Sequence, residues 1–339
     1  MSVIEPVVSS VVQREESYFE KTGRYRFLSF KAPATSFSLR FDSTNQATRV
    51  YWGDGTNVRI SNSSPSHSYT NRTIGEQIMV ELDQPLQNGI NNVRLVDTSN
   101  QNIDLAGTDL QVFWESLTNP TLDYIQLKDL DICRSIDSTI SNTLTTIDLR
   151  GNNISGDFPD NLSALTNMFI QDNNFEGKLP TVHIGIDRYQ VNGNRFRGPL
   201  PNIGGTTALT SFLAYNQSDD RLPTNDRVML TGEICNLDTT IVNFYHVGAG
   251  ASWAQGFRNA LTVASDFDVP TRMSKFYASN CTLSSDDVDQ ILTTFAAKAG
   301  TFLNPNIIDL SGNNGSPSST GLAAKTTLES NGWTVNVSS

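Results

Sequence analysis

The chain is acidic but sparsely charged, and this composition excludes some classes of function. Its 339 residues carry 24 Lys and Arg against 35 Asp and Glu, a net charge of −11, so we exclude sequence-independent nucleic-acid binding, which needs a basic surface. No apolar run approaches the roughly 18 residues of a membrane-spanning helix, and no membrane insertion is expected.

Residues 1–22 are rich in apolar side chains but do not form a secretory signal. The apolar run is broken by Glu5 and Pro6, no basic segment precedes it, and no small-residue cleavage site follows. We expect an N-terminal arm, which packs either on the chain's own first domain or on a partner subunit. The apolar residues of this partner-docking arm are Val3, Ile4, Val7, Val8, Val11 and Val12.

Residues 23–97 form the predicted first domain, an antiparallel β-sandwich. Short segments of alternating apolar and polar residues are separated by clusters of Pro, Gly, Asn and Ser. Residues 51–56 read Tyr-Trp-Gly-Asp-Gly-Thr, where Asp-Gly suits a tight turn, and residues 67–69 read His-Ser-Tyr. These two motifs resemble the PKD-type immunoglobulin-like module, whose members commonly serve as spacers or binding modules.

Residues 98–339 form the predicted second domain, which is organised by a repeat between Leu144 and Pro201. Three successive copies agree at apolar positions 21 residues apart, for example Leu144, Leu165 and Ile186. An asparagine recurs in each copy, and a Gly-x-aliphatic-Pro segment closes it. This pattern resembles the leucine-rich-repeat family and implies a solenoid of stacked rungs. The repeated asparagines are Asn152, Asn173 and Asn194.

The repeat register extends in both directions to about nine rungs. Each rung has two inward apolar residues separated by one outward residue. We expect the inward pairs to run from Ile103 and Leu105 to Ile308 and Leu310, with Phe244 and His246 as one of them. We expect Phe113 and Trp114 to close the open end, and we expect residues 217–228 to form an exposed loop insertion.

The later rungs are longer, with room for short outer helices. Trp253–Ala264 and Ser284–Ala299 are the candidates, and Ser284 with Asp287 resembles a capping box. The end of the chain, from Ile308 to Val335, resembles an ending found in bacterial and phage repeat proteins. It predicts a last rung, a helix over about residues 320–330 and a strand with Trp333, which together cap the stack. The fold class is thus mainly β with some α.

The sequence contains no recognisable catalytic constellation, and we expect neither an enzyme nor a bound cofactor or metal. It has no Gly-x-Ser-x-Gly elbow, His-Glu-x-x-His, P-loop or CxxC pair. The acidic pairs Asp219-Asp220 and Asp266/Asp268 are expected to face water rather than bind calcium. Cys133, Cys235 and Cys281 are too few and too scattered for a disulfide framework or a zinc site, and Cys281 suits a buried free thiol.

The positive signal for function lies on the outward face of the solenoid strands. Ordinary rungs place polar residues there, whereas the middle and later rungs of this chain place aromatic and apolar ones. Such a stripe suits sugar stacking or a protein interface, unless an inserted loop or a neighbouring subunit covers it. The predicted binding residues are Phe169, Arg188, Leu213, Tyr215, Tyr245, Lys275 and Tyr277.

Together these features predict a non-enzymatic recognition protein. The favoured hypothesis is a bacteriophage virion protein of the tail, baseplate or capsid decoration. It would be made in the host cytoplasm without a signal peptide, attached to other virion proteins through the arm, and able to bind host-surface glycan or protein. The alternative is a bacterial cell-surface or secreted adhesin. A glycan depolymerase would need a placed carboxylate pair, which the sequence does not show.

Overall fold

The computed structural model describes most of the chain from residue 120 onward and parts of the chain before it. The described residues are 25–32, 36–42, 48–53, 55–60, 66–68, 77–82, 90–96, 110–112, 117, 120–136, 140–223, 226–237, 242 and 244–339. The predicted arm, residues 1–22, therefore lies outside the described residues, as do Phe113, Trp114 and the rung expected at Ile103–Leu105.

The chain divides into two compact units, which are described separately. One contains the chain up to Leu122 with short returns at Leu130–Ile132 and Thr139–Ser141, and the other contains Asp123–Asp129, Cys133–Ser138 and Asn142–Ser339. The first unit includes strand β8 (Gln111–Val112), which pairs with β1 (Tyr25–Lys31).

The described strands of the first unit pair in an antiparallel manner. One sheet has the order β4-β3-β6-β1-β8, and β2 pairs with both β5 and β7. Its described core includes Phe30, Val80 and Trp52, each with at most 2% of its surface exposed. The remaining strands are β2 (Ser36–Asp42), β3 (Thr48–Tyr51), β4 (Asn57–Ile60), β5 (Ser66–Ser68), β6 (Gln77–Leu82) and β7 (Ile90–Val96).

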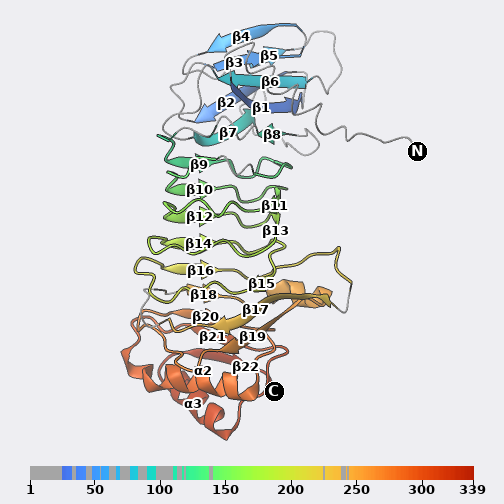
Figure 1. Ribbon diagram of the computed structural model, residues 1–339. Helices are drawn as coiled ribbons and strands as arrows, with labels where there is room; N and C mark the ends of the chain where they lie inside the picture. Colours follow the sequence, from blue (N-terminus) through green and yellow to red (C-terminus); the bar gives the residue numbers. More distant parts are fainter. Residues whose placement is uncertain are drawn as a thin grey trace, which may run out of the picture. The chain divides into compact units, whose positions relative to one another are not determined.

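The second unit is a stack of short parallel strands, as the repeat predicts (Figure 1). In-register pairing places Ile147, Met168 and Tyr189 side by side, and all three are buried. The stacked strands are β9 (Tyr124–Gln126), β10 (Thr146–Asp148), β12 (Asn167–Phe169), β14 (Arg188–Gln190), β16 (Ser211–Leu213), β18 (Phe244–His246), β20 (Lys275–Tyr277), β21 (Ile307–Leu310) and β22 (Thr334–Val337).

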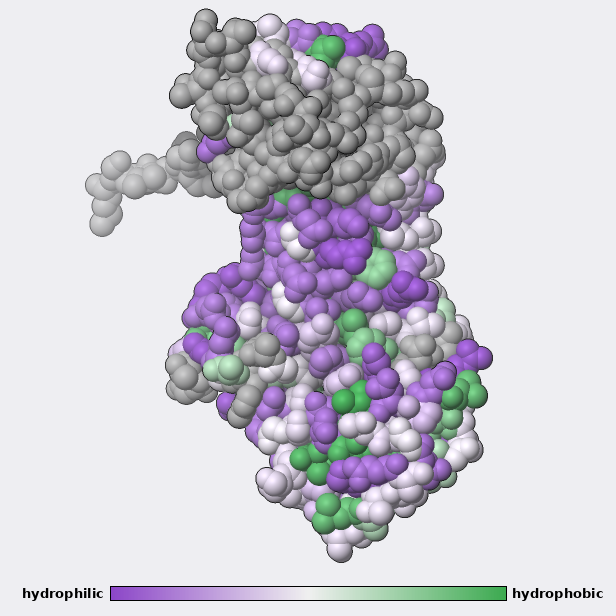
Figure 2. Space-filling model, turned by 180° about the vertical axis from the view of Figure 1, so that it is seen from behind, coloured by the Kyte–Doolittle hydropathy of each residue, from purple (hydrophilic) through white to green (hydrophobic). Residues whose placement is uncertain are grey.

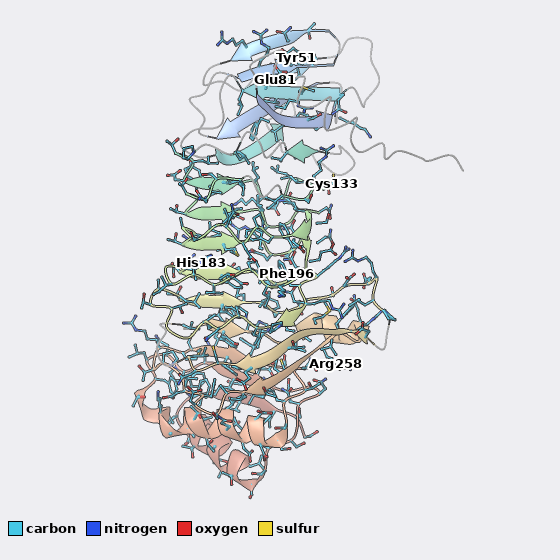
Figure 3. The ribbon with its side chains drawn as sticks, viewed as in Figure 1. Tyr51, Glu81, Cys133, His183, Phe196 and Arg258 are labelled. Atoms are coloured by element: carbon cyan, nitrogen blue, oxygen red, sulfur yellow. The ribbon has the colours of Figure 1, made fainter. Side chains whose placement is uncertain are left out.

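The inner column of this stack becomes aromatic in its middle rungs. Rings of Tyr189, Phe212, Tyr245 and Phe276 stack face to face, with centroids 5.0, 5.2 and 5.3 Å apart. Such offset ring pairs add to the stabilisation gained by burial. Phe175 and Phe196 form a second stacked pair with centroids 6.3 Å apart, and both are fully buried; Phe196 is labelled in Figure 3.

The register predicted for the rung at residues 244–249 is wrong by one residue. Tyr245 pairs with Phe212 and Phe276, so it points inward, whereas Phe244 and His246 point outward. In the segment Phe-Tyr-His-Val, either Phe244 and His246 or Tyr245 and Val247 could point inward. Only the second choice buries two residues that tolerate an apolar interior. Both are almost fully buried, and the choice keeps imidazole out of the core.

An asparagine ladder ties consecutive rungs together. The Asn173 amide donates hydrogen bonds to the carbonyls of Leu149 (2.8 Å) and Ile170 (3.2 Å), while its oxygen accepts one from the Ile154 amide (3.1 Å). Each ladder side chain thus satisfies buried backbone groups of its own and neighbouring rungs. Asn152, Asn194 and Gln217 repeat this arrangement.

In the longer rungs, residues at other positions or of another type supply the ladder side chain. In the rung of β18 the turn after the strand carries Ala249 and no ladder asparagine, and Asn259 instead donates to the Val247 carbonyl and accepts from the Leu230 amide. Cys281 is buried in its slot, with its thiol near the carbonyls of Val247 and Ser279. In the last rung Asn314 occupies the ladder position and donates to the carbonyls of Ala278 and Leu310.

A second column of turn residues shows an alternation between Asx and glycine. Just beyond the sheet strands the backbone adopts positive φ, which favours Gly, Asn and Asp. At Gly193 a Cβ atom would lie under 3.0 Å from the Asp172 carboxylate, so each Asx side chain fills the space that the next glycine leaves open. Asp129, Asp172, Asn216 and Asn280 alternate in this Asx–Gly column with Gly151, Gly193, Gly250 and Gly312.

Short strands and helices complete the other side of the rungs. The predicted helix at Trp253–Ala264 is wrong, because a 3₁₀ turn (Gly250–Gln255) leads into a strand whose Asn259, Leu261 and Val263 are buried with a period of two. The strands on this side are β11 (Ser155–Asp157), β13 (Asn174–Glu176), β15 (Gly198–Pro199), β17 (Val228–Ile234) and β19 (Arg258–Val263).

The end of the stack is capped as the sequence predicts. Helix α2 (Ser285–Ala297) begins with a capping box of Ser284 and Asp287, and α3 (Ser319–Ser330) precedes β22. Trp333 is 3% exposed and packs edge-on against Phe295 and Phe302, with centroids 5.5 and 5.0 Å away. Within the described part of the chain, no helix is long and apolar enough to cross a membrane.

Candidate binding face

The outward side chains of the stacked strands form one continuous surface. Parallel pairing in register places Phe169, Gln190, Leu213, His246 and Tyr277 in a single column across five consecutive rungs. Because neighbouring strands are about 4.8 Å apart, each side chain in such a column contacts the next. The composition of the column therefore decides what the face can bind.

An aromatic cluster occupies this face at β16, β18 and β20. The Tyr215 and His246 rings stack with centroids 3.9 Å apart, and the Tyr277 ring lies 4.6 Å from His246. Phe244 meets Tyr277 edge-on at 5.9 Å, and the Lys275 ammonium lies 5.2 Å from the Phe244 ring. We call Tyr215, Phe244, His246, Lys275 and Tyr277 the outer aromatic cluster; all five are partly exposed.

Burial keeps the central ring of this cluster uncharged. Desolvation lowers the pKa of His246 to about 3, so its imidazole is neutral near pH 7. Desolvation also raises the pKa of Tyr215 and of Tyr277, with the carboxylates of Asp172 and Asp309 adding to the respective shifts, so both hydroxyls stay protonated. The cluster therefore presents flat neutral rings and a single cation, Lys275.

The neighbouring rungs of the same face offer hydrogen-bonding groups. The Arg150 guanidinium lies 5.5 Å from the Phe169 ring and donates to Asp148 at 2.8 Å. The second carboxylate oxygen of Asp148 and the amide oxygen of Gln171 are buried acceptors without a hydrogen-bond donor. Both oxygens have almost no accessible surface, so they lie beneath the face and the Arg150 guanidinium is the accessible polar group here.

The structure places most of the predicted binding residues on this face and corrects two of them. Phe169, Tyr215, Lys275 and Tyr277 are partly exposed there, and Arg188 is exposed beside Asp187 at 3.8 Å. Leu213 has the predicted outward position but is only 8% exposed, because neighbouring side chains cover it. Tyr245 is only 2% exposed and belongs to the inner aromatic column, because of the register error described above.

Sequence reasoning missed Phe244 and His246, which replace Tyr245 on the face. The signal that identifies them is Val247, whose full burial requires Tyr245 to be its inward partner.

The acidic pairs also differ from expectation. Asp219 is 5% exposed and is held by Arg221 at 2.7 Å, and Asp268 lies 2.8 Å from the Lys298 ammonium, so neither simply faces water.

Other candidate chemistry lies elsewhere in the chain. His183 is half-buried in a turn, where its backbone carbonyl accepts a hydrogen bond from the Ile186 amide at 3.1 Å (Figure 3). The side chain of His67 and the whole of Tyr69 lie outside the described residues. Among the side chains that the structure describes, no group of three or more His, Cys, Asp or Glu residues is arranged to hold a metal ion.

Comparison with known proteins finds similarity only at the level of structure. No protein-family model matches the chain, and no curated protein matches its sequence. Among solved structures, the BIR2 ectodomain from Arabidopsis thaliana is 19% identical over 32% of this chain and 59% of that chain, with a TM-score of 0.24. The chain thus spans about three fifths of that ectodomain.

Two further solved structures are plant receptors in complex with their ligands. The leucine-rich-repeat ectodomain of the Arabidopsis thaliana receptor kinase GASSHO1/SCHENGEN3, in complex with CASPARIAN STRIP INTEGRITY FACTOR 2, is 15% identical over 67% of this chain and 31% of that chain (TM-score 0.34). The plant peptide hormone receptor RGFR1, in complex with RGF2, is 16% identical over 68% and 49% (TM-score 0.30).

The second unit has a leucine-rich-repeat fold. This assignment rests on the chain's own 21-residue repeat, its parallel rungs and its asparagine ladder.

Proposed function

We propose that this protein is a non-enzymatic binding protein and that its ligand docks on the exposed face of the leucine-rich-repeat sheet. The observation that carries the proposal is the outer aromatic cluster, where Tyr215, His246 and Tyr277 form a continuous neutral ring surface. Ordinary rungs place polar side chains there, and partly exposed aromatic groups gathered on one face are typical of interaction surfaces.

A saccharide is the ligand that best fits this face. Sugar rings stack their apolar C–H surface on flat aromatic rings, while their hydroxyls donate hydrogen bonds to carboxylate and amide oxygens. The cluster offers the rings, and the partly exposed carboxylate of Asp309, which pairs with Tyr277 on the next strand, offers acceptor oxygens. A protein partner, whose side chains would pack on the same rings, is the second candidate.

A glycan array probed with the purified protein tests this proposal. Tyr277→Ala and Phe244→Ala remove rings from the cluster and are expected to abolish or strongly weaken binding to any glycan that the unaltered protein retains. Tyr124→Ala, on β9 and in the same column as Phe244 but several rungs away, is the matched control. If no glycan binds, or if all three variants bind equally, the saccharide proposal fails.

We further propose that the first unit is a PKD-type immunoglobulin-like sandwich that acts as a spacer or binding module. In support, Trp52 is 2% exposed and its amide donates to the Thr56 carbonyl at 3.1 Å. Gly53 and Gly55 both have positive φ, as the tight turn of the motif requires. An experimental structure of residues 23–122 within the full chain tests this proposal, because it would show whether the two sheets pack face to face.

The biological setting that we propose is a bacteriophage virion, where the chain serves in the tail, the baseplate or capsid decoration. The support is the resemblance of residues 308–335 to an ending found in bacterial and phage repeat proteins. The arm, residues 1–22, would attach the chain to other virion proteins, and the solenoid would bind host-surface glycan or protein. A bacterial cell-surface or secreted adhesin is the alternative.

Mass spectrometry of purified phage particles from the source tests the virion proposal. A few to a dozen copies of this chain per particle are expected for a tail or baseplate protein, and hundreds for capsid decoration. Deletion of residues 1–22 should then prevent incorporation into particles. Absence of the chain from particles contradicts the virion proposal and favours the adhesin.

A further inference from the structure

A groove with a volume of about 740 Å³ opens on the side of the rungs opposite the sheet strands. It lies between strands β11, β13 and β15 and the inserted loop that precedes β17, and its size is in the range of small-molecule sites. We call it the lateral groove. Its charged lining residues are Asp157, Glu176, Lys178, Arg195, Arg197, Asp219, Arg221 and Asp226.

Ion pairs fix the wall of the lateral groove. Arg221 binds Asp219 through two hydrogen bonds of 2.7 Å, one from Nε and one from Nη2, and also donates to Glu176. Arg197 lies 3.5 Å from Asp226. The bidentate pair stiffens the inserted loop, and the contacts of Arg221 with Glu176 and of Asp226 with Arg197 link this loop to the rungs.

These pairs leave two cations and one carboxylate for a ligand. The lining has equal numbers of basic and acidic groups, although the whole chain has a net charge of −11. Glu176, Asp219 and Asp226 are engaged by Arg221 and Arg197, whereas Lys178 and Arg195 have no ion pair among the described residues. Hydrogen bonds from Arg221 are the main cause of the lowered pKa of Asp219, and the charge of Arg195 adds to this shift, so the Arg195 guanidinium lies near the paired wall.

We propose that the lateral groove binds an acidic saccharide, a ligand that carries carboxylate groups and several hydroxyls. Its carboxylate would lie between Lys178 and Arg195, and its hydroxyls would donate to Asp157 and accept from the remaining N–H groups of Arg197. The charged lining suits a hydroxyl-rich ligand, because each hydroxyl both donates and accepts. Much of the described surface in Figure 2 is hydrophilic, and the groove brings two cations without an ion-pair partner together in one hollow.

Titration calorimetry of the full chain with trigalacturonic acid tests this proposal, and the fully methyl-esterified trimer is the matched neutral ligand. We expect the acid to bind and the ester to bind at least about tenfold more weakly. Arg195→Gln and Lys178→Gln should each weaken binding of the acid about tenfold. Arg272→Gln removes an exposed cation outside the groove and should leave the affinity unchanged.

Several results would overturn the proposal. Absence of binding, equal affinity for acid and ester, or indifference to Arg195→Gln and Lys178→Gln would each do so, once circular dichroism shows that the variants are folded. A glutamate-rich peptide that binds as tightly as the trimer would place the ligand among proteins instead. Tyr277→Ala separates this proposal from the one for the aromatic face: it should leave trigalacturonate binding intact, and selective loss there would move the ligand to that face.

Discussion

The Asx–Gly column can be tested with a double-mutant cycle at Asp172 and Gly193. Gly193 has φ +64°, and alanine in a left-handed conformation costs about 1–2 kcal/mol. Its new methyl group would also displace the Asp172 carboxylate, which adds about 0.5–1.5 kcal/mol for a distorted rotamer. We therefore expect Gly193→Ala to lower the free energy of unfolding by about 2–3 kcal/mol.

The second variant in the cycle isolates the steric contribution. In an Asp172→Ala background the displaced carboxylate is absent, so Gly193→Ala should cost only about 1–2 kcal/mol, a coupling of about 1 kcal/mol. Urea denaturation of the four proteins measures these values. Hydrogen exchange of residues 165–200 shows whether the loss is local.

Gly185→Ala is the control for this cycle. Gly185 is exposed, has no positive φ and has nothing within 4 Å of its Cβ position, so the substitution should be neutral or slightly stabilising. If Gly193→Ala costs the same in both backgrounds, to within about 0.3 kcal/mol, the two residues do not share space and the explanation of the alternation is wrong.

Three further predictions concern the solenoid. Asn194→Ala should lower the free energy of unfolding by about 3 kcal/mol in urea denaturation, because it leaves buried carbonyls and a buried backbone amide without hydrogen-bond partners. The control is Asn142→Ala at an exposed position, which should change the free energy of unfolding by less than about 0.5 kcal/mol. His246 takes up protons more readily when unfolded, so acidification from pH 6.5 toward 3 should destabilise the unaltered protein more than His246→Gln in thermal unfolding. Ser284→Ala removes the capping box and should cost about 1 kcal/mol, visible as faster hydrogen exchange at the start of α2.

The repeat made much of the second unit predictable. Wherever rungs recur every 21 residues, the inward positions and the ladder asparagines follow from the spacing, and the structure confirms them at Asn152, Asn173 and Asn194. The prediction failed at residues 244–249, where the spacing changes and Phe-Tyr-His-Val allows two registers. No local pattern indicated that Asn259, within β19, would supply the missing ladder side chain.

The binding surfaces were predictable only in part. The outward positions of the strands predict where most of the aromatic side chains lie, whereas Leu213 and Tyr245 are buried; that this face binds a ligand stays a prediction. The lateral groove could not be predicted, because its residues come from separate rungs and an inserted loop. Asp219 is an example: its sequence suggests a solvated acidic loop, but the residue is buried and pairs with Arg221, which also donates to Glu176 on a distant rung.

The origin of the ladder side chains has a consequence for how this protein can change its length. Each 21-residue rung carries its own asparagine and bonds mainly to adjacent rungs, so deletion or duplication of one such rung restores the same ladder contacts, although it places two glycines or two Asx residues on neighbouring rungs of the Asx–Gly column. The sheet would then shorten or lengthen by about 4.8 Å at a time. The rung of Tyr245 has its ladder position filled by Asn259, which lies in β19, a strand that also pairs with β17. This rung can therefore be deleted only together with its neighbours. Natural relatives that differ in length are therefore expected to differ in whole short rungs between Leu144 and Pro201.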